Sequence, residues 1–305
     1  MSDAAYAHTP VAEARQRVAL AALLAGAVAI AFAPIFVRLS ELGPSATAFW
    51  RVAFATPALM LWLTLEQRRL GPAARRPATN RDWWLLGLAG FTFAGDLAVW
   101  HWSIRLTSVA NSTLLANFAP IFVAPAAWLL LGEKIRPAFV LGLLLAIGGA
   151  VLLMGQSVSL SVDHILGDAL GIVTAGFYAA YMLVVSRLRG AFSTATIMAW
   201  SAVVTAILLI PVALLSGESL AAPTLYGWAI LLGLALISHA GGQSLIAYAF
   251  AYLPASFSSV ALLLQPAVAA VLAWLLFNEA LGPLQALGGM VILAGLVIAR
   301  RASQA

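Results

Sequence analysis

Long runs of apolar residues, separated by short polar segments, dominate the sequence. Each run holds about 20 residues or more, enough for an α-helix to cross roughly 30 Å of hydrocarbon at 1.5 Å per residue. The runs are continuous and do not alternate between apolar and polar positions, which excludes the strands of a closed β-barrel. The pattern predicts an all-α polytopic membrane protein with ten spans, at residues 18–38, 45–65, 82–104, 107–131, 136–155, 166–187, 192–215, 225–250, 254–277 and 281–299.

Composition leads to the same class of protein. The 305 residues are 63% hydrophobic and only 9% charged, whereas a soluble domain is about half apolar and roughly a quarter charged. One soluble core cannot hide so much apolar surface, so the lipid bilayer is an expected partner. The net charge of +5 is spread along an apolar chain and does not indicate nucleic acid.

The positions of the cations predict the orientation of the spans. If the N-terminus is cytosolic, thirteen of the sixteen Lys and Arg residues lie on the inner side. Arg38 and Arg105 lie at outer ends, and Arg51 lies within the second span. Because cytoplasmic segments carry the excess of Lys and Arg, both termini are expected in the cytosol.

The second half of the chain repeats the first at an offset of 146 residues without a gap. About 20 of the 70 positions from Trp84 onward are identical, a self-similarity that marks repeat architectures. We assign residues 1–155 and 156–305 to two repeats of five spans each. Because five is odd, the repeats enter the membrane in opposite directions, which is the inverted topology of secondary transporters. The aligned pairs include Pro120 with Pro266, Trp128 with Trp274, Glu133 with Glu279, Pro137 with Pro283 and Gly142 with Gly288.

These features together resemble a known family. Ten spans and two copies of Pro–(x)12–Glu, each followed by Pro and Gly, look like the EamA-type branch of the drug/metabolite transporter superfamily. Within it the chain most resembles bacterial exporters of aromatic amino acids. The resemblance implies export of small metabolites across the bacterial inner membrane, through a central cavity lined by spans 1, 3, 4, 6, 8 and 9.

Two histidines within spans are candidate substrate ligands. His239 and Gln243 are four residues apart and share one face of span 8, and the offset of 146 maps them onto Phe93 and Leu97. One turn further along span 3 lie Trp100 and His101. We expect both histidines at the central cavity, binding substrate or accepting a proton, with a packing role for each as the alternative.

Asp96 lies deep within span 3, where a lone carboxylate must be protonated or paired with a cation. It is a candidate proton-coupling or amine-binding group. The alternatives are a structural bridge to Arg51 in span 2 and a protonated acid bonded to a neighbouring helix.

Further polar groups precede the repeated prolines. Asn117 lies shortly before Pro120, and Gln265 directly precedes Pro266. Because proline frees helix carbonyls, these stretches are candidate substrate contacts or gates, although small polar residues also join helices by packing. Tyr178 in span 6 offers an aromatic ring and a hydroxyl for stacking on an aromatic or hydrophobic side chain, or lies at the lipid interface.

The sequence therefore predicts a transporter of amino acids and related small metabolites, with no catalytic residue, metal or cofactor. No phosphate-binding loop of an ATP-driven pump is present, and cysteine is absent. A drug or nucleotide-metabolite exporter of the same fold is the alternative. An intramembrane hydrolase would need paired carboxylates at one depth, whereas Asp168 lies nearer a span end than Asp96.

Overall fold

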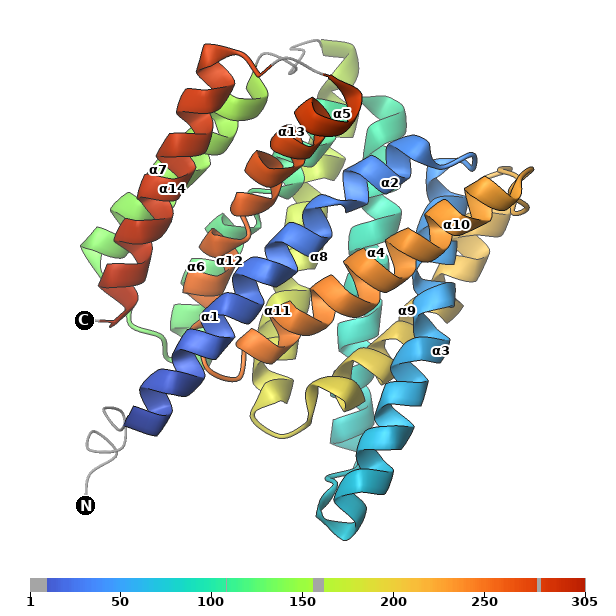
Figure 1. Ribbon diagram of the computed structural model, residues 1–305, viewed down its shortest axis with the longest axis vertical. Coiled ribbons are helices and arrows are strands. Elements are labelled where there is room, and N and C mark those ends of the chain that lie inside the picture. Colours follow the sequence, from blue (N-terminus) through green and yellow to red (C-terminus); the bar gives the residue numbers. More distant parts are fainter. Residues whose placement is uncertain (1–9, 108, 156–161, 279–280, 305) are drawn as a thin grey trace.

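The computed structural model describes residues 10–107, 109–155, 162–278 and 281–304. Throughout these ranges every regular element is a helix, and the helices stand together in one bundle (Figure 1). Ten segments are long and apolar enough to cross a membrane. The predicted all-α polytopic fold with ten spans is confirmed.

Several spans are assembled from more than one helix. The first five spans are α1 (Pro10–Ala31) with α2 (Ala33–Leu39), α3 (Pro44–Leu70), α4 (Asn80–Leu106), α5 (Val109–Ala116) with α6 (Ala119–Leu131), and α7 (Pro137–Met154). The second five are α8 (Ile165–Arg189), α9 (Thr194–Leu215), α10 (Leu225–Gly233) with η5 (Leu234–Gln243) and α11 (Ser244–Ala249), α12 (Ala255–Ala261) with α13 (Leu264–Phe277), and α14 (Pro283–Gln304). Short 3-10 turns, η2 (Gly71–Ala73) and η4 (Val162–His164), follow α3 and precede α8.

The first and last spans reach the same side of the bundle. Glu13 and Arg17 of α1 line one surface pocket together with Arg300 and Ser303 of α14, and the start of α1 and the end of α14 both lie at the lower left in Figure 1. We call this side the termini side and the opposite one the far side. Odd-numbered spans run from the termini side to the far side, and even-numbered spans return.

Three spans are interrupted just before a proline. The helix breaks precede Pro34 in span 1, Pro120 in span 4 and Pro266 in span 9. Proline lacks the N–H that the carbonyl four residues earlier needs, and its ring crowds that carbonyl, so the helix is disrupted there. The breaks at Asn117 in span 4 and Leu263 in span 9 are 146 residues apart, which is the offset of the sequence repeat.

Span 8 contains a π-helix, η5, between two α-helical segments. Such wide turns are rare and occur often at functional sites. η5 lies directly against α1, because a Cβ on Gly26 would come within 2.9 Å of the Gly242 carbonyl oxygen. The Ser238 hydroxyl donates a hydrogen bond of 2.9 Å to the Ala29 carbonyl. The irregular segment is therefore held against the first span.

The last spans of the two repeats, α7 and α14, pack side by side through glycines (Figure 1). A Cβ on Gly142 would lie 2.7 Å from the Gly295 oxygen, and one on Gly288 would lie 2.7 Å from the Gly149 oxygen. Gly142 and Gly288 are 146 residues apart, and so are Gly149 and Gly295. The second contact is therefore the counterpart of the first in the other repeat. The interface is therefore self-complementary, as a pseudo-two-fold axis between antiparallel repeats requires.

Phe93 and His239 locate the pseudo-two-fold axis. The two residues are 146 positions apart, and their ring centroids lie 5.2 Å apart. A residue that touches its own counterpart must lie beside the axis. The axis therefore passes between α4 and η5, near the middle of the bundle.

Carboxylates at span ends connect the repeats on the termini side. Glu133, after span 4, accepts backbone hydrogen bonds from Ala255 at 2.6 Å and Ser256 at 3.0 Å, as well as one from the Ser256 hydroxyl. It thereby caps the N-terminus of α12 in span 9. Glu66 near the end of α3 accepts a 2.5 Å hydrogen bond from Ser193, the N-cap of α9.

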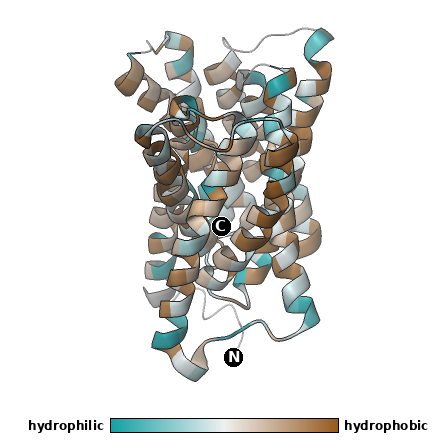
Figure 2. Ribbon diagram, turned by 90° about the vertical axis from the view of Figure 1, so that its right-hand side faces the viewer, coloured by the Kyte–Doolittle hydropathy of each residue, from teal (hydrophilic) through white to brown (hydrophobic). Residues whose placement is uncertain are grey.

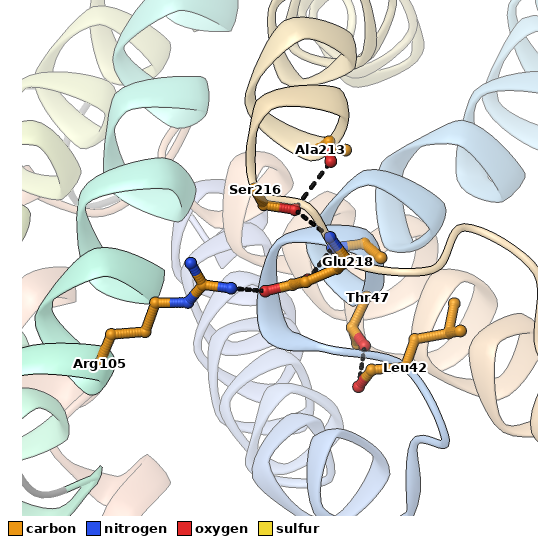
Figure 3. A network of polar contacts seen from close by, with 7 residues as sticks. Leu42, Thr47, Arg105, Ala213, Ser216 and Glu218 are labelled. Atoms are coloured by element: carbon orange, nitrogen blue, oxygen red, sulfur yellow. Dashed lines mark hydrogen bonds and ion pairs between the residues drawn. The ribbon is translucent and has the colours of Figure 1, made fainter.

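Glu218 makes the corresponding connection on the far side, between α9 and α3. It accepts a hydrogen bond of 2.9 Å from the Ala46 amide in the first turn of α3. Its other oxygen receives the Arg105 guanidinium at 2.6 Å, and the Ser216 hydroxyl accepts from its amide at 3.2 Å (Figure 3). Spans 2, 3 and 7 are thus joined at one point. Glu279, which the repeat aligns with Glu133, lies outside the described residues.

The outer surface of the bundle is apolar, as a lipid environment requires. Brown, hydrophobic residues run along the length of the helices in Figure 2, and teal residues gather towards the two ends. Exposed large apolar side chains occur in both repeats, among them Leu129, Leu144, Leu215 and Leu275.

Candidate functional site

A cavity of about 440 Å³ lies between the two repeats. All six spans that the family resemblance implies contribute to its lining, and spans 2, 5 and 10 contribute as well. The predicted site residues that line it are Asp96, Trp100, Asn117, Tyr178, Gln243 and Gln265. The structure therefore brings most of the predicted set together in one place.

The cavity extends from the middle of the bundle towards the far side. Val37 at the end of α2, Met154 at the end of α7 and Gln285 at the start of α14 all belong to its lining, and all three positions are at far-side helix ends. On the termini side of Gln265, the next turns of span 9 include Phe257 and Val260, which are fully buried. Packed side chains thus separate the cavity from the termini side.

Arg51 and Asp96 face this cavity from spans 2 and 3. They form no ion pair within 4.0 Å. The structural bridge considered from the sequence is therefore not made in this state. Sequence reasoning identified Arg51 only as a partner for Asp96, and a cation within an apolar span was the signal that it belongs to the site.

Three polar side chains meet at the deep end of the cavity. Tyr178, Gln243 and Gln265 come from three different spans and all line the cavity here. Gln243 Oε1 and Gln265 Nε2 are enclosed and have no hydrogen-bond partner within the described residues. Because a buried polar atom without a partner costs free energy, these atoms are available to a ligand or to water.

Asn117 lies at the break in span 4, where its backbone leaves the helix. Its side-chain amide donates a 2.8 Å hydrogen bond to the Thr113 carbonyl, which leaves its oxygen free to accept. The Ala116 carbonyl, on the same cavity wall, loses its helical donor because Pro120 stands four residues later. The break therefore supplies acceptors to the cavity.

Most of the remaining wall is apolar and aromatic. Phe93 and Trp100 of α4 contribute rings, and Ile30, Leu97 and Met154 contribute aliphatic or thioether surface. Such a combination of a few polar groups with apolar walls is typical of sites for small organic molecules.

Neither predicted histidine lines the cavity. His101 is buried, and its Nδ1 donates to the Leu97 carbonyl one turn earlier. His239 is buried against the ring of Phe93, and its two nitrogens have no partner among the described residues. The participation of either histidine in substrate binding stays a prediction.

Asp168 has a structural environment of its own. It accepts hydrogen bonds from Thr107 at 2.6 Å and Asn111 at 3.0 Å. It does not line the cavity that Asp96 faces, so the two carboxylates are not placed together as a hydrolytic pair would require. Among the described residues, no group of three or more His, Asp or Glu side chains is arranged to hold a metal ion.

The chain is similar in sequence to several transporters. An "Uncharacterized transporter" of Archaeoglobus fulgidus is 28% identical over 87% of this chain and 91% of its own length. A "Probable terminal-alkyne amino-acid exporter" of Streptantibioticus cattleyicolor is 27% identical over 90% of this chain and 89% of its own. The "Pseudopaline exporter CntI" of Pseudomonas aeruginosa is 26% identical, covering 83% of this chain and 84% of its own.

The fold and the family model agree with these similarities. A solved crystal structure superposes with a TM-score of 0.79 at 18% identity, covering 94% of this chain and 97% of that one, which supports the fold. The model of the EamA-like transporter family matches residues 17–155 and again residues 165–301. Since these matches include most of the ten spans described above, the chain is a multi-pass membrane protein that belongs to the EamA-like transporter family.

Proposed function

We propose that this protein exports amino acids, aromatic and other hydrophobic ones, together with related small metabolites, across the bacterial inner membrane. The observation that carries the proposal is the cavity between the repeats, where Arg51 and Asp96 face apolar and aromatic walls. Its volume of about 440 Å³ lies in the range of small-molecule sites. The name of the Streptantibioticus relative, an amino-acid exporter, favours this substrate class.

The proposed orientation places the termini side in the cytosol. Thirteen of the sixteen Lys and Arg residues lie towards that side, as the excess of cations in cytoplasmic segments predicts. The far side then faces outward, and the cavity is open to the outside. This is the state from which an exporter releases its substrate.

Transport is proposed to occur by alternating access between the two repeats. The contact between α7 and α14 is the same when the repeats exchange roles, because each glycine contact has its counterpart. The breaks in spans 4 and 9 allow half-helices on either side of the cavity to move separately. Opening to the cytosol would separate the packed turns of α12 from their neighbours and close the far-side mouth.

Counterflow in proteoliposomes tests the proposal. Vesicles loaded with unlabelled phenylalanine should accumulate labelled phenylalanine with saturable kinetics, and other amino acids should compete. Drugs and nucleosides serve as competitors of other classes. If folded protein gives no counterflow with any amino acid, or if drugs or nucleosides compete better, the proposed substrate class is wrong.

Proton coupling is proposed to depend on Asp96, the carboxylate in the cavity. A coupled exporter responds to an imposed pH gradient with net uphill flux, whereas a uniporter does not. Asp96→Asn should abolish that flux and leave downhill exchange measurable if Asp96 carries the proton. A pH-independent wild-type flux would refute the proposed coupling role of Asp96.

A further inference from the structure

We propose that Arg51 and Asp96 bind the two ends of a zwitterion, Arg51 the carboxylate and Asp96 the ammonium group. The site would therefore select α-amino acids in which both groups are free, over amines or acids of the same side chain. This inference rests on the proposed function and names the residues that recognise its substrate.

Arg51 is the first half of the argument. It is 9% exposed, lies within a membrane span and lines the cavity. Its Nε is enclosed without a partner, and no described carboxylate forms an ion pair with it. An enclosed guanidinium without a counter-ion is costly, so this state is stabilised by an anionic ligand. A guanidinium matches a carboxylate with two parallel hydrogen bonds.

Asp96 provides the opposite charge on the neighbouring span. It is half-buried, lines the same cavity and makes no side-chain hydrogen bond to any described residue. Its oxygens do not belong to the enclosed atoms that lack a partner, so they are reachable from the cavity. The carboxylate can accept from an ammonium group there.

The two charged groups line the same cavity but form no direct ion pair within 4.0 Å. A molecule carrying a carboxylate and an ammonium group on one carbon would meet and neutralise both charges within this cavity. An amine would leave Arg51 without a counter-ion, and an acid would leave Asp96 without one. In a partly desolvated cavity, each unpaired charge weakens binding more than it would in water.

Additional acceptors line the same cavity. The Ala116 carbonyl is released by Pro120, and the Ile30 carbonyl is released by Pro34 in the same way. An ammonium group has three N–H donors. Those that do not bond Asp96 can donate hydrogen bonds to these carbonyls. The charged ends fix the backbone of the amino acid, and the side chain then meets the apolar wall around Trp100.

A series of phenylalanine analogues tests the inference in the wild-type protein. Competition with labelled phenylalanine is measured for unlabelled phenylalanine, for phenethylamine, which lacks the carboxylate, and for 3-phenylpropionate, which lacks the amine. We expect each analogue to compete about 10- to 100-fold more weakly than phenylalanine, since each loses a charged hydrogen-bonded contact. Equal competition by all three would overturn the inference while leaving amino acid transport intact.

Two variants then assign the ends. Arg51→Gln should weaken phenylalanine about 10- to 100-fold and leave phenethylamine unchanged or better, so the preference for the carboxylate disappears. Asp96→Asn should weaken phenylalanine by a similar factor and leave 3-phenylpropionate unchanged, so the preference for the amine disappears. Matched controls are Arg105→Gln and Asp168→Asn, which remove the same charges outside the cavity and should keep the wild-type order of competitors.

The outcomes separate the two levels of the proposal. If wild-type protein binds no amino acid, the proposed function fails, and this inference fails with it. If phenylalanine binds but the folded variants weaken all three compounds by the same factor, Arg51 and Asp96 act structurally, and only the zwitterion site is refuted. Folding of each variant is checked by its elution as a single species in detergent.

Discussion

Replacing Gly149 by alanine should separate the last spans of the two repeats. The new Cβ would lie 2.7 Å from both the Gly288 oxygen and the Ile292 nitrogen, whereas ordinary van der Waals contact begins at 3.4 Å. Both atoms belong to backbone, so no side chain can rotate away, and α14 must move by several tenths of an ångström. Overpacking of this kind costs about 1–3 kcal/mol.

The neighbouring glycine supplies the control. Gly148 has no heavy atom within 4 Å of a built Cβ, so Gly148→Ala adds no clash and gains about 1 kcal/mol of helix propensity. In detergent, the unfolding temperature of Gly149→Ala should be roughly 2–10 °C lower than that of wild type. The unfolding temperature of Gly148→Ala should equal or exceed that of wild type. Both glycines lie in α7 and each variant gains one methyl group, so the difference between their unfolding temperatures reports the contact with α14.

A double variant tests the symmetry of the interface. Gly288→Ala meets the Gly149 oxygen at 2.7 Å, so once one substitution has separated the helices, the second costs less. The loss of stability in the double variant should therefore be smaller than the sum of the losses for Gly149→Ala and Gly288→Ala by more than about 0.5 kcal/mol. Equal stability of Gly148→Ala and Gly149→Ala, or strict additivity of the pair, would refute the close glycine packing.

Three more outcomes follow from contacts at the helix ends and from the direction of the cavity. Glu133→Gln should lower stability by about 1–2 kcal/mol in thermal unfolding, because the charged cap of α12 is lost; an unchanged Tm would contradict the capping role. Glu218→Gln should cost more than Arg105→Gln, since the Glu218 side chain is 9% exposed and the Arg105 side chain is 45% exposed; equal costs would show that the ion pair dominates. The chain has no cysteine, so Ala269→Cys on the cavity wall and Ser303→Cys on the termini side report access; a membrane-impermeant thiol reagent added outside should modify the first and spare the second, and the opposite result would reverse the proposed orientation.

Much of the site was predictable because helix periodicity and proline chemistry are local properties. Tyr178 and Gln265 were expected at a central cavity and line it. Asn117 was expected near a weakened turn and lies at the break before Pro120. In each case the deciding information, the side chain and its spacing from a proline, lies within one span.

The histidines show where local reasoning fails. Successive residues on an α-helix point about 100° apart, so Trp100 can face the cavity while His101 turns towards the Leu97 carbonyl. His239 and Gln243 both belong to the π-helix η5, yet only one of them lines the cavity. Gln243 lines the cavity, and His239 packs on Phe93. A π-helix has no sequence signal that periodicity detects.

Arg51 illustrates a second limit of the sequence. Two opposite charges in neighbouring spans suggest a bridge, and the pattern of residues is the same whether they touch or face each other across a cavity. Only the relative placement of α3 and α4 decides between these cases, and that placement depends on the packing of all ten spans. The distinction changes the role of Arg51 from a structural partner to a substrate ligand, as proposed above.

The contact of Phe93 with its own counterpart, His239, has a thermodynamic consequence for a two-state carrier. Under the proposed alternating access, a pair beside the axis keeps equivalent surroundings when the repeats exchange shapes. A substitution there shifts the free energies of the outward-facing and inward-facing states by similar amounts, so it changes total stability more than the ratio of the two populations. That ratio is set instead by positions that do not touch their own counterparts and at which the halves differ, such as Asp96, whose counterpart in the second repeat is Gly242.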